Sequence, residues 1–449
     1  MITDDFDRPD SLLVISSYPE RGVKYSGKVC AVGGFVKNTI DAINSSSGGL
    51  MVGKIIVLTI SLGKEELYKE DGILIWRIFK RNNPFSYLHL WKAINRFKRT
   101  KNVLLEFEFA SFGDTLTTLF FPLTLVWLRL LGKTPFLVIH QVVPNLNEIY
   151  GHLGWKNKGI KNKFFDLGLK AFYWILLLFC EKAIVLEKVL KERLVDQVGW
   201  AQKIQVIPHG VDKQQRIIDK QQARTLLRIK NDELICLYFG YLTWYKGVDL
   251  LIKAFSLPDI KINNRSVKLI IAGGESFTQS NKIHYKKFVK GIYNSLKKTK
   301  NILITGFVEE KKIPLYFSAA DLVILPYRTF MSSSGPLSLA CSFNKPFILS
   351  SALEDYVKSA DFALSLAETG LNKEEILFSC SDKRFIKKLT DSFNKDKMGK
   401  LIKFSKNLAQ KRDFKVIALE YIRLLSQSKA KSVNPISSYE VIKVVSSNN

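Results

Sequence analysis

The chain has 449 residues, a length that suits two domains of about 200 residues better than a single core. Hydrophobic residues make up 47% and charged residues 24%, which is typical of a globular protein and excludes an intrinsically disordered one. The net charge of +27 would attract a polyanion such as nucleic acid, anionic lipid or a phosphorylated substrate. It could equally come from lysines on solvated faces, so charge alone identifies no function.

The cysteines and the apolar stretches bear on the cellular compartment. The cysteines are odd in number, widely spaced and without a CxxC pair, which indicates neither a disulfide framework nor a zinc site; they are Cys30, Cys180, Cys236, Cys341 and Cys380. The first ten residues are acidic and lack the apolar centre of a secretory signal. Two apolar stretches, 116–131 and 171–180, are too interrupted or too short to span a membrane. We expect a cytoplasmic protein that is soluble or lies on the cytoplasmic face of a membrane.

In the first half of the chain, short apolar runs alternate with helical patterns. A first strand is predicted at Ser11–Ser17, before a loop rich in Gly, Lys and Tyr and a helix at Gly34–Ile43. The further strands predicted here are Lys54–Ile60, Asn102–Glu108, Pro135–His140, Ala183–Leu186 and Ile204–Ile207, with an apolar helix around Leu123. Strands separated by helices indicate a parallel sheet with helices on both faces.

The second half repeats this plan. Its predicted strands are Leu234–Phe239, Val267–Ala272, Asn301–Ile304, Leu322–Pro326 and Pro346–Ser350. We therefore predict an α/β protein with two doubly wound, Rossmann-like domains, residues 1–205 and 206–425, and a disordered or loosely packed tail, 426–449. The natural ligand site is the cleft between the carboxyl ends of the two sets of strands.

The segment Phe239–Gly247 carries the strongest local signal. A strand ends at Gly240, a tight loop carries Lys246, and a helix begins after Gly247. A cation and free backbone N–H groups at a helix N-terminus favour an anion, and a diphosphate fits this arrangement. Taken alone, the segment is equally compatible with an ordinary turn that carries a surface lysine.

Several other segments surround the lysine loop in a characteristic order along the chain. They are Ile207–Asp212 before it, and Ala272–Gly274, Gly306–Val308 and Ser318–Asp321 after it. Together with the lysine loop they resemble glycosyltransferase family 4, which has the GT-B fold. The resemblance covers about residues 11–350 and is closest from Val206 to Ser350. The turn Ser333-Ser334-Gly335 resembles that of a subgroup with a Ser-Gly turn. The resemblance implies a nucleotide-diphosphate sugar as co-substrate and no resident cofactor.

The resemblance also implies roles for individual residues. Lys246 would bind the donor diphosphate, and His140 would lie beside the transferred sugar, although a histidine that only completes the core is the alternative. His209 would structure the hinge between the domains. The loop Pro19–Gly34 would close over donor and acceptor. The residues implied to bind the donor are Gly34, Gly240, Tyr241, Lys246, Gly306, Phe307, Val308, Ser333, Ser334 and Gly335.

Two departures from the family pattern affect the enzyme interpretation. Tyr241 replaces the usual arginine of the first loop, and Met331 and Leu339 occupy the positions of the family's Glu-x7-Glu pair. The support that the first glutamate gives to the sugar would then come from Ser332 or backbone N–H groups. The alternative is a catalytically degenerate GT-B protein that serves as a partner subunit.

No metal site is expected. The Asp-x-Asp letters of Asp5-Phe6-Asp7 precede the first strand in a terminus expected to be flexible, and such a short match arises by chance. A lysine and helix dipoles can neutralise the leaving diphosphate instead. Retention of anomeric configuration is implied by the family resemblance.

Two basic segments suggest where an acceptor is presented. Trp155–Lys170 interleaves five lysines with aromatic residues, and Asn281–Lys300 has seven lysines and no acid. The first can lie in an anionic headgroup layer or form a solvated helix face. No nucleic-acid recognition motif accompanies the charge. We expect a retaining glycosyltransferase that acts on a glycan or lipid-linked acceptor at a membrane surface; a basic polyanion-binding protein is the remaining alternative.

Overall fold

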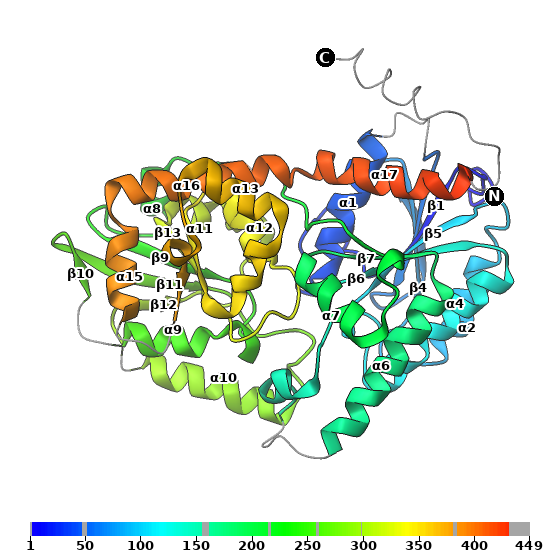
Figure 1. Cartoon of the computed structure of the whole chain (residues 1–449), viewed down its shortest axis with the longest axis horizontal. Coiled ribbons are helices and arrows are strands. Elements are labelled where there is room, and N and C mark those ends of the chain that lie inside the picture. Colours follow the sequence, from blue (N-terminus) through cyan, green and yellow to red (C-terminus); the bar gives the residue numbers. More distant parts are fainter. Residues whose placement is uncertain are drawn as a thin grey trace, which may run out of the picture.

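The computed structural model describes residues 2–46, 52–154, 161–213, 217–256, 260–297, 299–379 and 384–430, without the side chains of 161–164 and 428–430. The chain forms two α/β bodies side by side, each built around one sheet (Figure 1). The predicted α/β fold with two doubly wound parallel sheets is confirmed.

The first body contains an eight-stranded sheet within the described residues, in the order β3-β4-β2-β1-β5-β6-β7-β8. Its strands are β1 (Leu12–Ile15), β2 (Ile55–Ile60), β3 (Glu66–Glu70), β4 (Ile73–Phe79), β5 (Asn102–Phe107), β6 (Thr134–Ile139), β7 (Lys182–Val185) and β8 (Ile204–Val206). All neighbouring strands pair in parallel except β3, which is antiparallel to β4. Burial on both faces explains why the parallel strands are continuous apolar runs.

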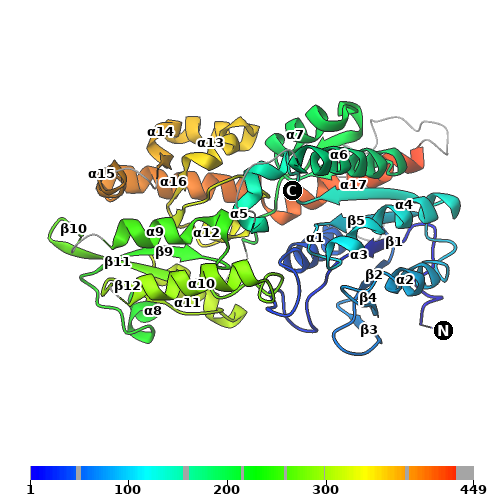
Figure 2. The same ribbon diagram turned by 90° about the horizontal axis from the view of Figure 1, so that it is seen from below.

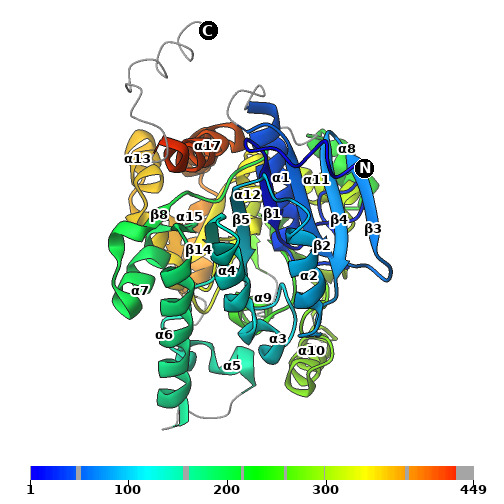
Figure 3. The ribbon, with the colours of Figure 1, turned by 90° about the vertical axis from the view of Figure 1, so that its right-hand side faces the viewer.

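Different helices cover the two faces of this sheet (Figure 3). Its helices are α1 (Val32–Ser46), α2 (Ser86–Ile94), α3 (Thr115–Leu119), α4 (Phe121–Leu130), α5 (Tyr150–Leu153), α6 (Lys161–Phe179) and α7 (Lys188–Val198). Leu13 and Ile15 of β1 belong to the core formed with α2, α4 and α6. Leu12 and Val14 belong to the core formed with α1. Alternating side chains of one strand therefore build two separate layers.

The second body has a smaller sheet, in the order β10-β11-β9-β13-β14-β15, with β12 also paired to β11. Its strands pair in parallel except β10, which is antiparallel to β11. Its strands are β9 (Leu234–Phe239), β10 (Lys261–Ile262), β11 (Arg265–Ala272), β12 (Ile302–Ile304), β13 (Leu322–Leu325), β14 (Phe347–Ser350) and β15 (Leu377–Phe378). Its helices are α8 (Lys220–Leu226), α9 (Val248–Phe255), α10 (Ile283–Leu296), α11 (Ile313–Ala319), α12 (Gly335–Ser342), α13 (Ala360–Thr369), α14 (Lys373–Ile376), α15 (Arg384–Ser392) and α16 (Lys395–Lys411).

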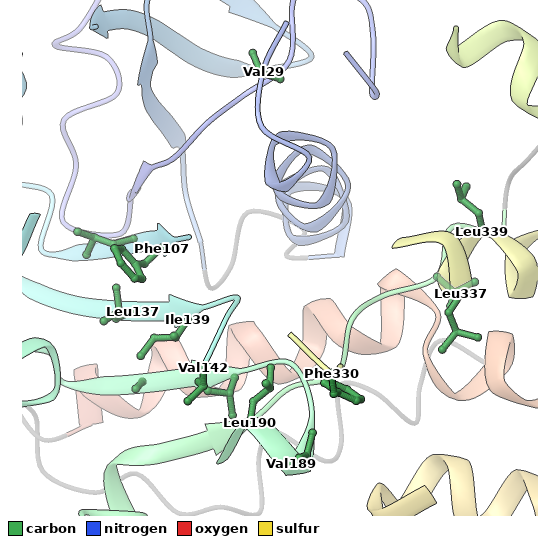
Figure 4. Close-up of a cluster of buried hydrophobic side chains, with 14 of the residues drawn as sticks. Val29, Phe107, Leu137, Ile139, Val142, Val189, Leu190, Phe330, Leu337 and Leu339 are labelled. Carbon is green, nitrogen blue, oxygen red and sulfur yellow. The ribbon is translucent and has the colours of Figure 1, made fainter. Parts of the chain in front are cut away.

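The two bodies share one continuous core. Phe330 of the second body lies among Val142, Val189 and Leu190 of the first (Figure 4), and all four belong to the same buried cluster. Arg193 of α7 donates a hydrogen bond to the carbonyl of Phe330. These contacts fix the distance between the carboxyl ends of the two sheets.

The last described helix, α17 (Phe414–Ala430), returns to the first body (Figure 1). Its residues Ile417, Tyr421 and Leu425 are buried in the core that includes α1. The sequence analysis placed residues 414–425 with the second domain and began the tail at 426. Both assignments need correction here, because the apolar face of α17 packs on the first sheet and the helix extends to Ala430.

Two further features differ from the sequence predictions. Strands β3 and β4 were not predicted. β3 is charged and largely exposed, and the apolar run of β4 is interrupted by Arg77. The N-terminus is not flexible in its described part, because Phe6 is buried and the Asp7 carboxylate accepts hydrogen bonds from the N–H groups of Arg99 and Thr100. Asp7 therefore holds a turn of the first body.

Candidate active site

The lysine loop lies at the carboxyl end of β9. Its cation, Lys246, ends a short 3-10 helix, η3 (Trp244–Lys246), and precedes α9. Gly247 follows with φ +67°, and a Cβ there would overlap the carbonyl oxygen of Pro326, so the turn requires glycine. The sequence therefore folds here as a strand, a tight turn and a helix, as predicted.

The ammonium group of Lys246 is buried without a counter-ion. The side chain is 8% exposed, and within the described residues it has no hydrogen-bond or ion-pair partner. Burial lowers the pKa of Lys246 to about 8, while the charge of Glu108 opposes this shift. A buried cation of this kind favours the approach of an anion.

Neighbouring contacts place Lys246 beside the start of α12. A Cβ on Gly240 would lie 2.7 Å from Nζ of Lys246 and 3.4 Å from a side-chain carbon of Pro336. Gly335 and Pro336 form the first turn of α12. Nζ of Lys246 and Pro336 are therefore neighbours across Gly240, and a cation beside a helix N-terminus favours an anion such as a phosphate group.

Two contacts immobilise the lysine loop. Arg328, which follows β13, pairs with Asp249 of α9 at 2.5 Å and donates to the carbonyl oxygen of Trp244. From the first body, α5 packs on the loop, and a Cβ on Gly151 would meet the Trp244 ring at 2.3 Å. Figure 2 shows α5 at the junction of the two bodies. The position of the lysine therefore depends on both bodies.

The Ser333-Ser334-Gly335 turn is only partly available to a ligand. Ser334 caps α12 by accepting the N–H of Leu337, and its own N–H donates to the hydroxyl of Tyr356 at 2.8 Å. Gly335 is the first residue of the helix, so its N–H lies outside the intrahelical hydrogen bonds. A Cβ on Gly335 would meet nothing within 4 Å. The backbone N–H of Gly335 can therefore bind a phosphate, whereas that of Ser334 is already paired.

Ser333 contacts the first body. Its hydroxyl donates to Glu187, which lies directly before α7, at 2.7 Å. Glu187 is buried and forms a two-pronged ion pair with Arg412, at 2.6 and 2.9 Å. Arg412 also pairs with Asp361. This buried network joins the turn to the segment between α16 and α17.

The predicted nucleobase loop forms a rim beside the lysine loop. Phe307 is half exposed, and its ring stacks on Tyr241 with centroids 6.2 Å apart. Gly306 has φ +74°, and Val308 is buried in the core. Tyr241 and Phe307 thus present aromatic surface at the edge of the cleft, next to the Gly240 turn.

The loop before α1 crosses the cleft from the first body. The N–H groups of Lys24 and Tyr25 donate to Glu310 of the second body, at 2.7 and 3.1 Å. A Cβ on Gly27 would touch the Phe307 ring, while one on Gly34 would meet Tyr25 and the carbonyl of Lys24. The absence of a side chain at Gly34 therefore allows Lys24 and Tyr25 to pack closely against the start of α1.

His140 lies directly after β6 and is buried. Its Nε2 atom lies 2.7 Å from Oε2 of Glu106, and its ring packs edge-on against Phe35 of α1. His209, at the crossing between the bodies, contacts the same Phe35, and burial lowers its pKa to about 4. The implied hinge position of His209 agrees with these contacts, whereas His140 is held in a pair that the sequence did not predict.

Glu108 was missed by the sequence analysis although it enters the cleft. It follows β5, and its carboxylate accepts hydrogen bonds from the Cys30 thiol and from the side-chain amide of Gln141 at 3.0 Å. The backbone of Gln141 in turn pairs with Ser332 of the second body. The sequence does contain a signal for Glu108, because this carboxylate directly follows a buried strand, at the edge of the sheet where ligands bind.

The remaining predictions concern a metal site, the basic segment Trp155–Lys170 and membrane-spanning helices. In the described residues, no group of three or more His, Cys, Asp or Glu side chains is arranged to hold a metal ion. Residues 155–160 and the side chains of 161–164, which include Lys156, Lys158, Lys161 and Lys163, lie outside the described part. No described helix is both long enough and apolar enough to cross a bilayer.

Comparison with known families places this site in context. Residues 219–359, which contain the lysine loop and the Ser-Gly turn, match the model of the family Glycosyl transferases group 1. An uncharacterized glycosyltransferase of Methanocaldococcus jannaschii is 25% identical over 151 residues, which cover 32% of this chain and 36% of that protein. The alignment thus spans about a third of the relative.

Solved structures resemble almost the whole chain. Sucrose-phosphate synthase from Thermosynechococcus elongatus has a TM-score of 0.68 at 14% identity, covering 94% of this chain and all of that one. Anabaena HepE, solved in complex with UDP-glucose, has a TM-score of 0.63 at 15% identity, covering 93% and 99%. These likenesses establish the GT-B fold for this chain.

Proposed function

We propose that the protein is a retaining glycosyltransferase that transfers a sugar from a nucleotide-diphosphate sugar to a glycan or lipid-linked acceptor at a membrane surface. The observation that carries this proposal is the uncompensated, buried Lys246 beside the open N-terminus of α12, inside a glycosyltransferase group 1 domain. The UDP-glucose complex of HepE supports a nucleotide sugar as the donor.

In the proposed complex, Lys246 and the N–H of Gly335 bind the diphosphate and stabilise its charge as it leaves. Tyr241 and Phe307 provide the surface beside the nucleobase. The acceptor enters from the first body, where His140 and Glu108 follow neighbouring strands. Because donor and acceptor are held between the two bodies in a fixed orientation, the free-energy barrier to sugar transfer is lowered.

We further propose that Glu108 supplies the carboxylate that the family pattern lacks at Met331. Both Met331 and Leu339 are buried apolar side chains, so neither can hydrogen-bond a sugar. Glu108 reaches the cleft from the opposite body and influences the charge of Lys246. A carboxylate there can accept a hydrogen bond from a hydroxyl of the sugar or acceptor.

The absent glutamates also favour a second candidate, a catalytically degenerate partner subunit. A panel of UDP-, GDP-, ADP- and dTDP-sugars should separate the two, first by thermal shift and then by release of nucleoside diphosphate with a membrane extract as acceptor. Release that depends on one donor supports the enzyme. Donor binding without release supports the degenerate subunit, and no binding by any donor would reject both.

A further inference from the structure

Three neighbouring helices of the first body are apolar on the side that faces water. Helices α2, α4 and α6 lie next to one another on one face of the first sheet (Figure 3). The ring of Trp91 stacks on Trp127 with centroids 5.8 Å apart, which joins α2 to α4, and α4 packs on α6. They form a single layer whose inner side is already buried.

The outer side of this layer exposes large apolar side chains. The exposed fraction ranges from 40% to 74% for Leu88, Leu123, Leu130, Leu167, Trp174 and Leu178. In α6 the exposed stripe has helical spacing and runs opposite Phe172, Tyr173, Leu176 and Leu177, which face the core. A helix with apolar residues on both sides lacks the polar face that water requires.

Other surface helices expose apolar side chains among charged residues. In α10 of the second body, Ile283 is exposed, but so are the lysines Lys286, Lys287 and Lys290. The layer of α2, α4 and α6 differs because it gathers several exposed apolar side chains on one surface. A contiguous apolar surface of this kind marks a site of interaction.

The charge of the layer fits an anionic lipid surface. Residues 86–94, 121–130 and 165–179 contain the exposed cations Lys92 and Lys170, one acid, Asp166, and Arg129, which pairs with Glu181. The whole chain has a net charge of +27. Leucine and tryptophan side chains beside a few cations suit the boundary between headgroups and acyl chains. A lipid surface extends beyond the layer on all sides, so the layer can dock on it without a complementary shape.

We propose that the outer face of α2, α4 and α6 docks on an anionic lipid surface. The inference extends the proposed function, on which it rests for the position of the acceptor, because the same body carries His140 and Glu108. Docking through this layer would leave the second body free to exchange nucleotide sugar.

The test compares two triple variants in vesicle flotation. Vesicles of phosphatidylcholine with 30% phosphatidylglycerol are mixed with the wild type, with L123Q/L167Q/W174Q, and with the matched control L226Q/I283Q/L364Q from exposed positions of the second body. We expect the first variant to bind at least about tenfold more weakly and the control to bind like the wild type. Both variants should melt near the wild-type temperature, because the replaced side chains are exposed.

Several results would overturn the proposal. They are a wild type that does not float, a first variant that floats as well as the wild type, and a wild type that dimerises through this face without binding vesicles. Nucleoside-diphosphate release measured without vesicles keeps the two hypotheses apart. If release is absent but flotation depends on the layer, the proposed function fails while the docking surface stands.

Discussion

The hydroxyl of Ser333 donates a 2.7 Å hydrogen bond to the carboxylate of Glu187, which belongs to the other body. The implied diphosphate turn is therefore attached to the first body before any donor binds. Through Glu187 and Arg412 it is also attached to the segment that leads into α17. The position of the turn therefore depends on the position of the first body.

Replacing Glu187 by Gln should lower stability strongly. Arg412 would lose its two-pronged partner in a buried site, which costs about 3 kcal/mol or more. Ser333→Ala should cost only about 1 kcal/mol, because one hydrogen bond is lost. Thermal unfolding of both variants measures the difference. Equal melting temperatures for Glu187→Gln and the wild type would show that the ion pair contributes little.

Lys246→Ala should abolish donor binding, because the cation that binds the diphosphate is lost. The fold should stay intact, because no other side chain among the described residues loses a hydrogen-bond or ion-pair partner when Lys246 is removed. Titration calorimetry with the nucleoside diphosphate that gives the largest thermal shift measures the affinity. Lys253→Ala, an exposed position on α9, is the matched control and should bind normally. Unchanged affinity in Lys246→Ala would remove this residue from the site.

Donor affinity should depend on pH through Lys246. The pKa of about 8 means that the empty site loses its positive charge as pH rises through this value. Because the diphosphate binds the charged form, affinity should be constant below pH 8 and fall by about tenfold per pH unit above it. Lys246→Arg keeps its charge and should remove this dependence. A wild-type profile that is flat from pH 7 to 10 would contradict the prediction.

Glu108→Gln should lower turnover by about 10- to 100-fold, because an uncharged amide oxygen accepts a substrate hydroxyl more weakly than a carboxylate does. Donor affinity at pH 7 should change by less than about threefold, since Lys246 remains charged there. Cys30→Ser keeps the hydrogen bond to Glu108 and serves as the control. Steady-state kinetics that are the same for Glu108→Gln and the wild type would exclude the proposed role.

Gly335→Val tests the turn directly. Open space surrounds the position of its Cβ, so valine should lower the melting temperature little while it blocks the approach of a phosphate to the backbone. Donor affinity should fall severely, whereas Ser332→Ala should cost at most about tenfold, the scale of one hydrogen bond. If Gly335→Val keeps donor affinity and loses only stability, the turn is structural and the degenerate subunit gains support.

The sequence alone determined most of the parallel strands and the lysine loop. Buried parallel strands are continuous apolar runs, and a glycine turn between a strand and a helix is a local pattern, so Leu234–Phe239 and Lys246 could be located without the fold. The edge strand Glu66–Glu70 could not, because its residues are charged and largely exposed and lack that pattern.

The tertiary structure alone decided which side chains meet across the cleft. Glu187 and Ser333 are 146 residues apart, and Glu108 influences Lys246 from the opposite body. The return of α17 to the first sheet likewise depends on long-range packing of an amphipathic face. Such contacts leave no local periodicity, because their partners are brought together by the paths of both sheets rather than by spacing along the chain.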